Sequence, residues 1–399
     1  MTSGPIGNAP MQRIYLDHNA STPMDPRVVA AMQRWLGSAG GNPSSIHTEG
    51  RAARRAVEDA RDDVASLLGA DAVEIVFTSG ATEANVTALR GAFGVDGSPQ
   101  RLLVSAVEHA SILEPLRSSA AKTSGAVLLP VDREGRLELA ALELELRVPT
   151  DGVVLMAANN ETGALQPIRE AADLCAARGV RLHVDAVQLP GKVAATVAAI
   201  PGVTSAVVSA HKFGGPKGAG ALWIKSSTRC RPLLIGGGQE RDRRAGTENV
   251  PAIVGFGVAA RIANEELSER TTRLLAAEFA FLNRLQVIGV NHFRNGPLDA
   301  MHRLPGTINL LLPGRSGEAV VMGLDLEGVA VGLGSACASG AAKPSHVLAA
   351  MGLRPEDILS SIRISCGHGT SIEEATAAAD RLLRVLTRID AAPTSLSVL

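Results

Sequence analysis

The sequence predicts an α/β fold, with a mostly parallel β-sheet that carries helices on both faces, followed by a smaller α+β domain. From about residue 50 to residue 225, short apolar runs typical of buried strands alternate with stretches of helical periodicity. A long helical stretch at 254–287 then leads into a segment of different rhythm, with a Pro- and Gly-rich patch near 295–306. We therefore expect two domains.

The strands of the first region are short apolar runs that end in small or polar residues. Helical spacing of apolar residues in 51–68 predicts the helix before the first strand, and 167–178 is a second helical stretch. The predicted strands lie at 74–80, 101–106, 152–158, 181–186, 205–210 and 220–225. Because ligands gather at the carboxyl ends of parallel strands, the residues that follow these strands are candidates for a functional site.

The second region contains a predicted strand, GTINLLL at 306–312, and an amphipathic C-terminal helix near 371–388. We place the domain boundary near residue 265. The large domain then spans 18–265 and the small domain 266–399, with the N-terminal segment 1–17 joining the small domain.

Composition and charge exclude several classes of protein. With 399 residues, 46% of them hydrophobic and 20% charged, the chain is an ordinary globular protein and not a disordered one. A net charge of -1 provides no overall field that would draw it to nucleic acid or to an anionic membrane. The first residues, MTSGPIGNAPMQR, lack the apolar core of a signal peptide and are expected to form a loose tail. We expect a cytoplasmic protein.

One uncharged stretch, 193–210, needs a separate interpretation. Pro201 and Gly202 interrupt it, so we expect two short buried strands, or a strand and a loop, and no membrane-spanning helix. The basic run at 241–244 is short and has no interleaved aromatic residues, which argues against direct nucleic-acid binding.

The strongest chemical signal is a pair of residues at strand ends, Asp185 in HVDAVQ and Lys212 in SAHKFGGPKG, 27 positions apart. A pyridoxal cofactor needs a lysine amine that bonds to it covalently and a carboxylate that keeps its pyridine nitrogen protonated. Each residue alone has a simpler interpretation, because lysines in Gly-rich loops are usually solvated and a strand-end Asp is often a helix cap. The pair together favours a pyridoxal site.

A phosphate site should accompany such a cofactor, and FTSGATEAN at 77–85 fits it. The strand ends at Ser79 and Gly80, and a helix is expected to begin near Ala81 and Thr82, where free amides and the helix dipole favour an anion. An ordinary Ser/Thr helix cap is the alternative interpretation.

Two further strand ends carry polar side chains. His109 follows the predicted strand 101–106 and could stack on a cofactor ring and shuttle protons, although a lone His is more often structural. Asn159, Asn160 and Glu161 follow the strand 152–158, where amides could meet the ring's 3-hydroxyl group or a substrate carboxylate. An asparagine turn is the alternative at this position.

The four cysteines form neither a Cys-x-x-Cys pair nor a disulfide scaffold, and we predict no metal site. Cys337 lies in VGLGSACASGAAKPSHVL, a run of small residues that we expect to pack poorly and to move. A thiol on an accessible loop can ionise and attack, whereas a buried Cys is usually inert. Cys175 and Cys366 have the pattern of small core residues, and Cys230 fits either the surface or the core.

Taken in order, these motifs resemble the NifS/IscS-type cysteine desulfurases over nearly the whole chain. These are class-V aminotransferase-family members of the fold-type I pyridoxal-phosphate enzymes. The matching motifs are IYLDHNASTP, GNPSSIH, FTSGATEAN, EHASI, NNETG, HVDAVQ, SAHKFGGPKG, GGGQERDRRAGTEN, GSACASG and SIRIS. The resemblance implies a seven-stranded, mostly parallel sheet in the large domain, with the catalytic Cys loop carried by the small domain.

The resemblance also implies a role for each matching residue. Lys212 would be the lysine bonded to pyridoxal 5'-phosphate, Asp185 the partner of the pyridine nitrogen, and His109 the residue that stacks over the ring. The other cofactor contacts would be Gln188 and Asn160 on the oxygen side of the ring, and Ala81, Thr82, Ser209 and His211 at the phosphate. Thr247 would reach the phosphate of a neighbouring protomer, which implies a homodimer, and Arg363 would hold the substrate carboxylate as a bidentate fork.

The activity implied is removal of sulfur from L-cysteine, which gives L-alanine and a persulfide on Cys337. The extended form of the Cys337 loop resembles that of desulfurases which pass sulfur to an iron–sulfur scaffold or a tRNA-thiolation protein. Two departures from the family pattern, Lys343 where an acidic residue is common and SCGHGT after Arg363, leave the identity of this acceptor open.

Three alternatives remain at this stage. A selenocysteine lyase or a cysteine desulfhydrase would use the same cofactor site on a related substrate. A non-catalytic sulfur-transfer partner subunit is a third interpretation, but the presence of Lys212, Asp185, His109, Cys337 and Arg363 weakens it.

Overall fold

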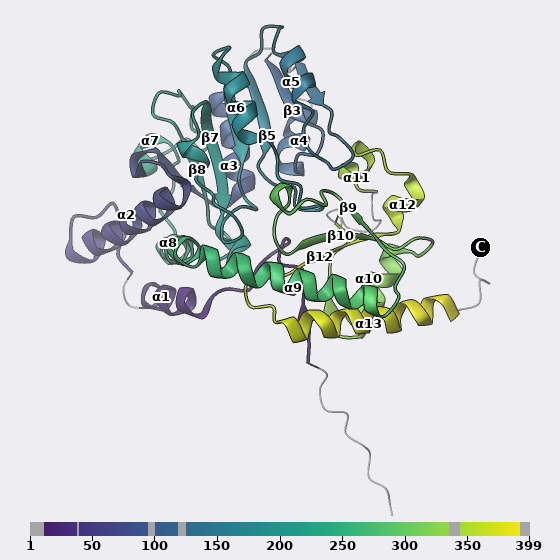
Figure 1. Cartoon of the computed structure of the whole chain (residues 1–399). Coiled ribbons are helices and arrows are strands. Elements are labelled where there is room, and N and C mark those ends of the chain that lie inside the picture. Colours follow the sequence, from purple (N-terminus) through teal and green to yellow (C-terminus); the bar gives the residue numbers. More distant parts are fainter. Residues whose placement is uncertain (1–11, 38–39, 95–99, 119–124, 335–343, 392–399) are drawn as a thin grey trace, which may run out of the picture.

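The computed structural model describes residues 12–37, 40–94, 100–118, 125–334 and 344–391 (Figure 1). Its main feature is a seven-stranded sheet with the strand order β2-β8-β7-β6-β5-β3-β4, in which β8 runs antiparallel to both of its neighbours. The predicted fold class is therefore confirmed. The strands are β2 (Ile75–Thr78), β3 (Arg101–Ser105), β4 (Gly125–Leu129), β5 (Gly152–Met156), β6 (Arg181–Asp185), β7 (Val203–Ser209) and β8 (Gly220–Ile224).

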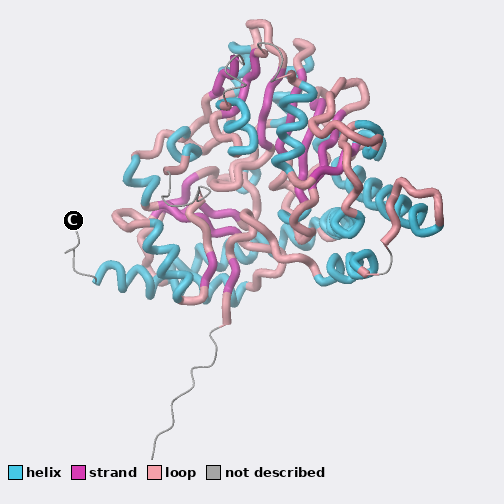
Figure 2. The backbone as a smooth tube through the Cα atoms, turned by 180° about the vertical axis from the view of Figure 1, so that it is seen from behind, coloured by secondary structure: helices cyan, strands magenta, loops and turns pink. Residues whose placement is uncertain are grey.

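Helices cover both faces of this sheet because successive strand residues point to opposite sides. In β5, for example, Val153 and Leu155 join the core on one face, whereas Val154 joins the core on the other. Figure 2 shows these strands in magenta with the helices around them. The helices of this part are α1 (Pro26–Leu36), α2 (Thr48–Leu68), α3 (Ala81–Thr87), α4 (Ala110–Arg117), α5 (Leu139–Glu145), α6 (Ile168–Ala176), α7 (Gln239–Asp242) and α8 (Val250–Glu265).

A second, smaller body of structure has its own core and its own sheets. Strands β12-β10-β9 form an antiparallel sheet, and β1 pairs in parallel with β11. Its strands are β1 (Ile14–Tyr15), β9 (Phe293–Asn295), β10 (Thr307–Leu311), β11 (Val329–Ala330) and β12 (Ser361–Ser365). Its helices are α9 (Leu267–Val287), α10 (Gly317–Leu326), α11 (His346–Ala350), α12 (Pro355–Leu359) and α13 (Ile372–Ala391).

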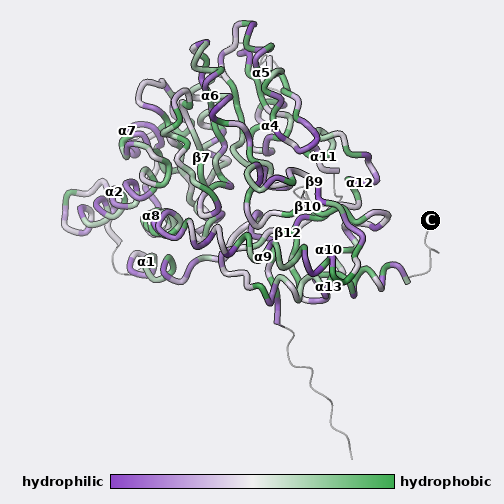
Figure 3. The backbone as a smooth tube through the Cα atoms, in the orientation of Figure 1, coloured by the Kyte–Doolittle hydropathy of each residue, from purple (hydrophilic) through white to green (hydrophobic). Residues whose placement is uncertain are grey.

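Amphipathic helices close the core of this smaller body. In Figure 3, α13 alternates between hydrophilic and hydrophobic colours along its length. Its buried residues, such as Leu382 and Leu386, pack with Leu274 and Phe281 of α9 and with Ile364 of β12. Since such a stripe recurs every three to four residues, the C-terminal helix could be predicted from sequence.

Two expectations differ from the structure. The helical stretch 254–287 is two helices that meet at Glu266, whose backbone leaves helical geometry and whose carboxylate bonds Arg27 and Arg270. No glycine or proline marks this break. Strand β4 was not predicted, and it forms the sheet edge, where Leu128 is 53% exposed. The uncharged stretch 193–210 is a loop followed by β7, as expected, and no helix within the described ranges is long and apolar enough to cross a membrane.

Candidate functional site

A cavity of about 530 Å³ opens at the carboxyl ends of β5, β6 and β7. Most of the predicted site residues line it together: Ala81, Thr82, His109, Asn160, Asp185, Gln188, Ser209, His211 and Lys212. Arg363 and Thr247 are not among its lining residues. Cys337 and Lys343 lie outside the described residues. The residues predicted at strand ends and those implied by the family resemblance therefore line one cavity together.

The base of the cavity is a chain of hydrogen bonds that holds Asp185 and His109. The Asp185 carboxylate, on a residue that is only 6% exposed, accepts from Asn85 Nδ2 at 2.9 Å and from the Val187 amide at 3.1 Å. Asn85 Nδ2 also donates to Ser111 Oγ at 2.9 Å, and Ser111 Oγ lies 2.9 Å from His109 Nδ1. One side chain, Asn85, thus orients both predicted residues.

His109 lines the cavity, as predicted, and it also has a structural role as the N-cap of α4. Its Nδ1 accepts from the Ser111 amide at 3.1 Å and so caps the first turn of α4. Because Nδ1 is an acceptor, the neutral ring carries its proton on Nε2. Partial burial of the ring lowers its pKa, and the positive charge of Lys212 lowers it further against the opposing effect of Asp185. The ring is therefore neutral and fixed in orientation at neutral pH.

Lys212 follows β7 in a short turn of helix, and its amine reaches back to the N-terminal segment. Its Nζ donates to the Asn19 carbonyl at 2.8 Å and to the Ala20 carbonyl at 3.1 Å. Burial lowers its pKa to about 8, with a further contribution from the nearby Arg363. A substantial neutral fraction therefore exists near pH 8, which a lysine needs if it is to act as a nucleophile or a base.

Asn19 and Lys192 hold residues of the cavity wall, and sequence reasoning missed both. Asn19 lies in LDHNA, and its carbonyl accepts from Gln188 Nε2 at 3.1 Å in addition to Lys212. The buried Lys192 Nζ donates to Asn19 Oδ1 at 2.5 Å and to Gln188 Oε1 at 2.9 Å, and burial lowers its pKa to about 7. Gln188 is therefore held at both ends of its amide. Asn19 lies in the quoted motif IYLDHNASTP, whereas Lys192 lies outside every quoted motif.

The two asparagines of the NNETG turn have different roles: Asn159 forms the turn and Asn160 lines the cavity. Asn159 is fully buried and makes the asparagine turn, since its Oδ1 accepts from the Glu161 amide at 2.9 Å and the Thr162 amide at 3.0 Å. Asn160 lines the cavity, and its carbonyl accepts from Asn19 Nδ2 at 3.0 Å. The turn of Asn159 thus presents Asn160 to the cavity.

The far end of the cavity is formed where β2 passes into α3. Gly80 is the N-cap of α3 and no side chain caps the helix, which rules out the ordinary Ser/Thr cap. Instead the Glu83 carboxylate accepts from the Ser79 amide at 2.9 Å. A Cβ atom on Gly220 would lie 2.6 Å from Gly80 Cα, so only glycine lets β8 pass this close to the turn. Cationic Lys217 also lines this end.

Arg363 approaches the cavity from the smaller body of structure. It lies on β12, and its side chain donates to the Asn160 carbonyl at 3.3 Å and to Asp17 at 2.5 Å. Its Nε is buried and has no partner among the described residues. The guanidinium therefore lies beside the cavity with its Nε–H unpaired.

Thr247 is exposed and belongs to a segment that is held against α3. Arg244, three residues earlier, pairs with Glu83 at 2.9 Å. Upstream, the buried Glu240 carboxylate accepts from both terminal nitrogens of Arg61, at 2.7 and 2.8 Å, although Glu240 has a positive φ of 49°. Such a backbone is costly for a residue with a Cβ atom, so this ion pair stabilises the segment.

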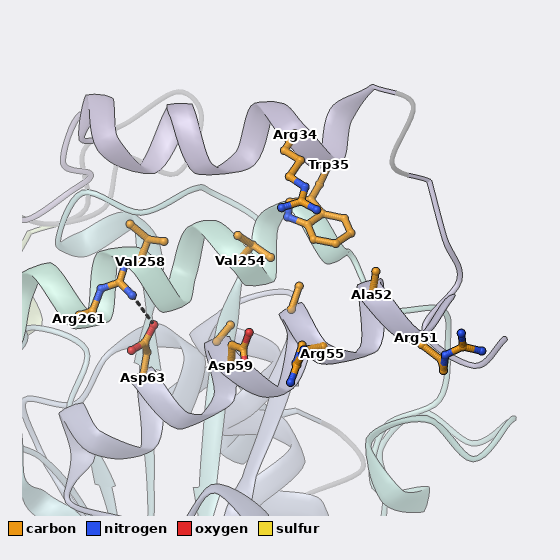
Figure 4. A pocket seen from close by; sticks show the side chains of 12 residues that line it. Arg34, Trp35, Arg51, Ala52, Arg55, Asp59, Asp63, Val254, Val258 and Arg261 are labelled. Atoms are coloured by element: carbon orange, nitrogen blue, oxygen red, sulfur yellow. Dashed lines mark ion pairs between the residues drawn. The ribbon is translucent and has the colours of Figure 1, made fainter. Parts of the chain in front are cut away.

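A larger cavity, of about 730 Å³, lies between α1, α2 and α8 (Figure 4). Arginines, Trp35 and the Arg261–Asp63 pair surround it. None of the predicted site residues contributes to it, and it is not at the strand ends. We therefore assign the site to the smaller cavity. No group of three or more His, Cys, Asp or Glu side chains suited to a metal occurs in the described part of the chain.

Cys175 and Cys366 are buried in the two cores, as predicted, and burial raises the pKa of each thiol to about 12. Cys230 is partly exposed beside Gly91, and its pKa is raised to about 11, again by burial. None of these three thiols is activated toward ionisation.

Comparisons with known proteins agree with the geometry of the site. The family model for class-V aminotransferases matches residues 14–377. The chain is 40% identical over 379 residues to a cysteine desulfurase IscS of Dictyoglomus turgidum, covering 95% of each chain. A solved NifS-like protein is 34% identical with a TM-score of 0.87, covering 94% of this chain and all of that one. Another, SspA in complex with cysteine, is 30% identical with a TM-score of 0.77, covering 89% and 99%. This chain therefore belongs to the class-V aminotransferase family, among its NifS/IscS-like cysteine desulfurases.

Proposed function

We propose that this protein binds pyridoxal 5'-phosphate in the strand-end cavity and removes sulfur from L-cysteine, releasing L-alanine and leaving a persulfide on Cys337. The observation that carries the proposal is the convergence of Lys212, Asp185 and His109 in one cavity. An amine of lowered pKa, a buried carboxylate and a fixed imidazole are the groups that this cofactor requires.

The cavity passes a test of fit for this cofactor. Asp185 is a buried carboxylate without a cationic partner among the hydrogen bonds of the described residues, and a protonated pyridine nitrogen would provide one. Ser209, His211 and the first residues of α3 would hold the phosphate, with Lys217 adding positive charge. Gln188 and Asn160 would face the oxygen side of the ring. When bound, pyridoxal phosphate would supply an electron sink for bond changes at the substrate's α-carbon.

Each of these residues of the chain would then have its own role in the reaction. Lys212 would bind the cofactor covalently, and its lowered pKa would let its amine take a proton from the substrate's α-carbon. Arg363 would bind the substrate carboxylate through N–H groups of its guanidinium. The Cys337 thiolate would attack the substrate sulfur. The sulfur–sulfur bond forms as the carbon–sulfur bond breaks, and the electron pair of the broken bond stays with carbon, which takes up a proton to give alanine.

A homodimer is part of the proposal. Thr247 is exposed and does not line the cavity of its own chain, as expected for a residue that serves the phosphate of a second copy. Leu234 and Ile235, in the same segment, are apolar and exposed, the latter by 89%, and a second copy would cover them. We further propose a cytoplasmic location and a protein acceptor for the sulfur, such as an iron–sulfur scaffold or a tRNA-thiolation protein.

The test compares alanine and persulfide formation from L-cysteine in the wild type, Lys212→Ala and Cys337→Ser. Cys230→Ser is the matched control, because it removes a partly exposed thiol that is not activated. We expect Lys212→Ala to lose the visible absorbance of the bound cofactor and at least a thousandfold in rate. Cys337→Ser should keep the absorbance and lose persulfide formation, and Cys230→Ser should retain both.

The outcomes also separate the competing functions. Full release of sulfur by Cys337→Ser without added reductant would reject the persulfide step and favour a selenocysteine lyase or a desulfhydrase. A wild-type protein that takes up no cofactor would reject the enzyme altogether and favour a non-catalytic partner subunit.

A further inference from the structure

Two chain positions on either side of Cys337 meet at one buried carboxylate, that of Glu161. Glu161 is 4% exposed, and its Oε2 accepts from Ser345 Oγ at 2.6 Å. On the other side of Cys337, a Cβ atom added to Gly334 would lie 3.1 Å from the same Oε2. Residues 334 and 345 thus flank a single acceptor atom.

Ser345 is the N-cap of α11, which fixes where that helix begins. Its Oγ accepts from the Leu348 amide at 3.1 Å while it donates to Glu161. The next residue, His346, donates from Nε2 to the Glu108 carbonyl at 2.9 Å. The first turn of α11 is therefore attached to two loops of the large sheet, those that follow β3 and β5.

These two attachments are directly adjacent in sequence to residues that line the cavity. Glu108 precedes His109, and Glu161 follows Asn160. Glu161 is itself held, since its amide donates to Asn159 Oδ1 at 2.9 Å and its carbonyl accepts from Asn309 Nδ2 at 3.4 Å. Asn309 is the register partner of Arg363 in the small sheet. Glu161 therefore lies at the junction of the cavity wall, the β10 strand that pairs with β12, and the chain that carries Cys337.

The backbone conformation of Gly334 and its distance from Glu161 both disfavour a larger residue at this position. Its φ of +95° lies in the left-handed region, where a residue with a Cβ atom is strained. An added methyl group would also press on the Glu161 carboxylate at 3.1 Å. The backbone therefore favours glycine at this position, and a side chain here would make a tight contact with Glu161.

We infer that Glu161 is a positioning residue for sulfur transfer: by holding Ser345 beside Gly334, it sets the place from which the Cys337 chain reaches the cavity. This inference rests on the proposed function, because it assigns Glu161 to the step in which Cys337 takes the sulfur. Glu161 touches neither cofactor nor substrate in this role. Its removal should slow persulfide formation and leave cofactor and L-cysteine binding intact.

The experiment uses the full-length holoenzyme and the variants Glu161→Ala, Glu161→Gln and Ser345→Ala. Binding of L-cysteine is followed by the change in cofactor absorbance, and persulfide on Cys337 is followed by mass spectrometry in a single turnover. We expect Glu161→Ala to bind both ligands within about twofold of the wild type and to form persulfide about tenfold to a hundredfold more slowly. Glu161→Gln keeps an acceptor oxygen for Ser345 and should recover most of the rate.

Ser316→Ala is the matched control for Ser345→Ala. Ser316 caps α10 in the same way, by accepting from the Ala319 amide at 3.3 Å, but it is exposed and remote from Glu161 in the hydrogen-bond network. Its variant should form persulfide at the wild-type rate. The double variant Glu161→Ala/Ser345→Ala should be no slower than the slower single variant, because both remove one interaction.

Persulfide formation at the wild-type rate in Glu161→Ala would overturn the inference, as would a parallel loss of L-cysteine binding and rate. If Glu161→Ala fails to fold, Ser345→Ala provides the same test from the other partner of the hydrogen bond. A wild-type enzyme that forms no persulfide would instead reject the proposed function, so the two failures are distinguishable.

Discussion

The two sides of the cavity are built differently. On the side of the large sheet, Asp185 and His109 are held by neutral partners, Asn85 and Ser111, through bonds of 2.9 Å. On the side of the smaller body, Arg363 is held by the charge of Asp17, from the N-terminal segment, and by a longer bond to the Asn160 carbonyl. One side is assembled within a single sheet, whereas the other exists only where separate segments meet.

This difference separates the expected effects of substitution. Neutral hydrogen bonds within one buried sheet fix the groups that would face a bound cofactor, so a change there should damage the chemistry itself. Charged contacts between segments place the group that would face the substrate, so a change there should alter substrate affinity first. The three predictions below test this separation.

The largest effect is expected for Asp185→Asn. An amide keeps the shape and can still accept one hydrogen bond, but it has no negative charge to hold a protonated pyridine nitrogen. We expect kcat to fall about a hundredfold to a thousandfold, with KM for L-cysteine changed less than threefold. Steady-state alanine formation, with cofactor content measured by absorbance, checks this.

Asp173→Asn is the control for this prediction, because Asp173 lies on the exposed face of α6. Its variant should match the wild type. A rise in KM without a fall in kcat for Asp185→Asn would remove the distinction between the two sides of the cavity.

An intermediate effect is expected for Arg363→Lys. A lysine keeps the charge but offers a point donor in place of the planar fork, so it cannot bind a carboxylate in the bidentate way. We expect KM for L-cysteine to rise about tenfold, which corresponds to about 1.4 kcal/mol, while the cofactor absorbance stays unchanged.

Arg354→Lys serves as the control for Arg363→Lys, since Arg354 pairs with Asp357 on the surface of the same part of the chain, with 69% of its side chain exposed. Its KM should equal that of the wild type. An Arg363→Lys enzyme that loses its cofactor would show that this side also builds the cofactor site.

Sequence reasoning found one side of the cavity better than the other, for a physical reason. Asp185 and Lys212 follow strands of one parallel sheet, and the carboxyl ends of such strands meet at one edge whatever the details of packing. Their partners could not be found in this way. Asn85 reaches Asp185 from 100 positions away, and nothing in the local pattern of α3 indicates which strand end it will face.

The same limit applies to contacts between segments. The charge on Asp17 was visible in LDHNA, but its partner Arg363 lies 346 positions away. The break at Glu266 was likewise missed, because no helix-breaking residue marks it and the pairing of its carboxylate with Arg27 of α1 exists only in the folded chain. Periodicity in the sequence predicts helices and strands. The partners of charged groups can be identified only once the chain is folded.

The smallest effect on the reaction is expected for Glu108→Gln. Glu108 precedes His109, and its carbonyl accepts from His346 Nε2. Glu108 is fully buried, its Oε1 accepts from the Met156 amide at 2.6 Å, and its Oε2 has no partner among the described residues. Burial, together with the nearby charge of Asp185, raises its pKa from 4.5 to about 8. The folded protein therefore keeps a proton that the unfolded chain releases between these two values. Folding stability linked to this group is present below pH 4.5 and is lost as the pH rises toward 8, by at most about 1.4 kcal/mol per pH unit.

The glutamine variant has no carboxyl group to ionise, so this part of the pH dependence should disappear. We expect urea unfolding to show a smaller fall in stability between pH 5 and 8 for Glu108→Gln than for the wild type, and kcat at pH 7 to stay within about threefold. Glu114→Gln, on the exposed face of α4, should keep the wild-type slope. An unchanged slope in Glu108→Gln would mean that Glu108 is ionised in the folded protein. A second buried charge would then lie near that of Asp185, and the groups around Asp185 and His109 would not all be neutral.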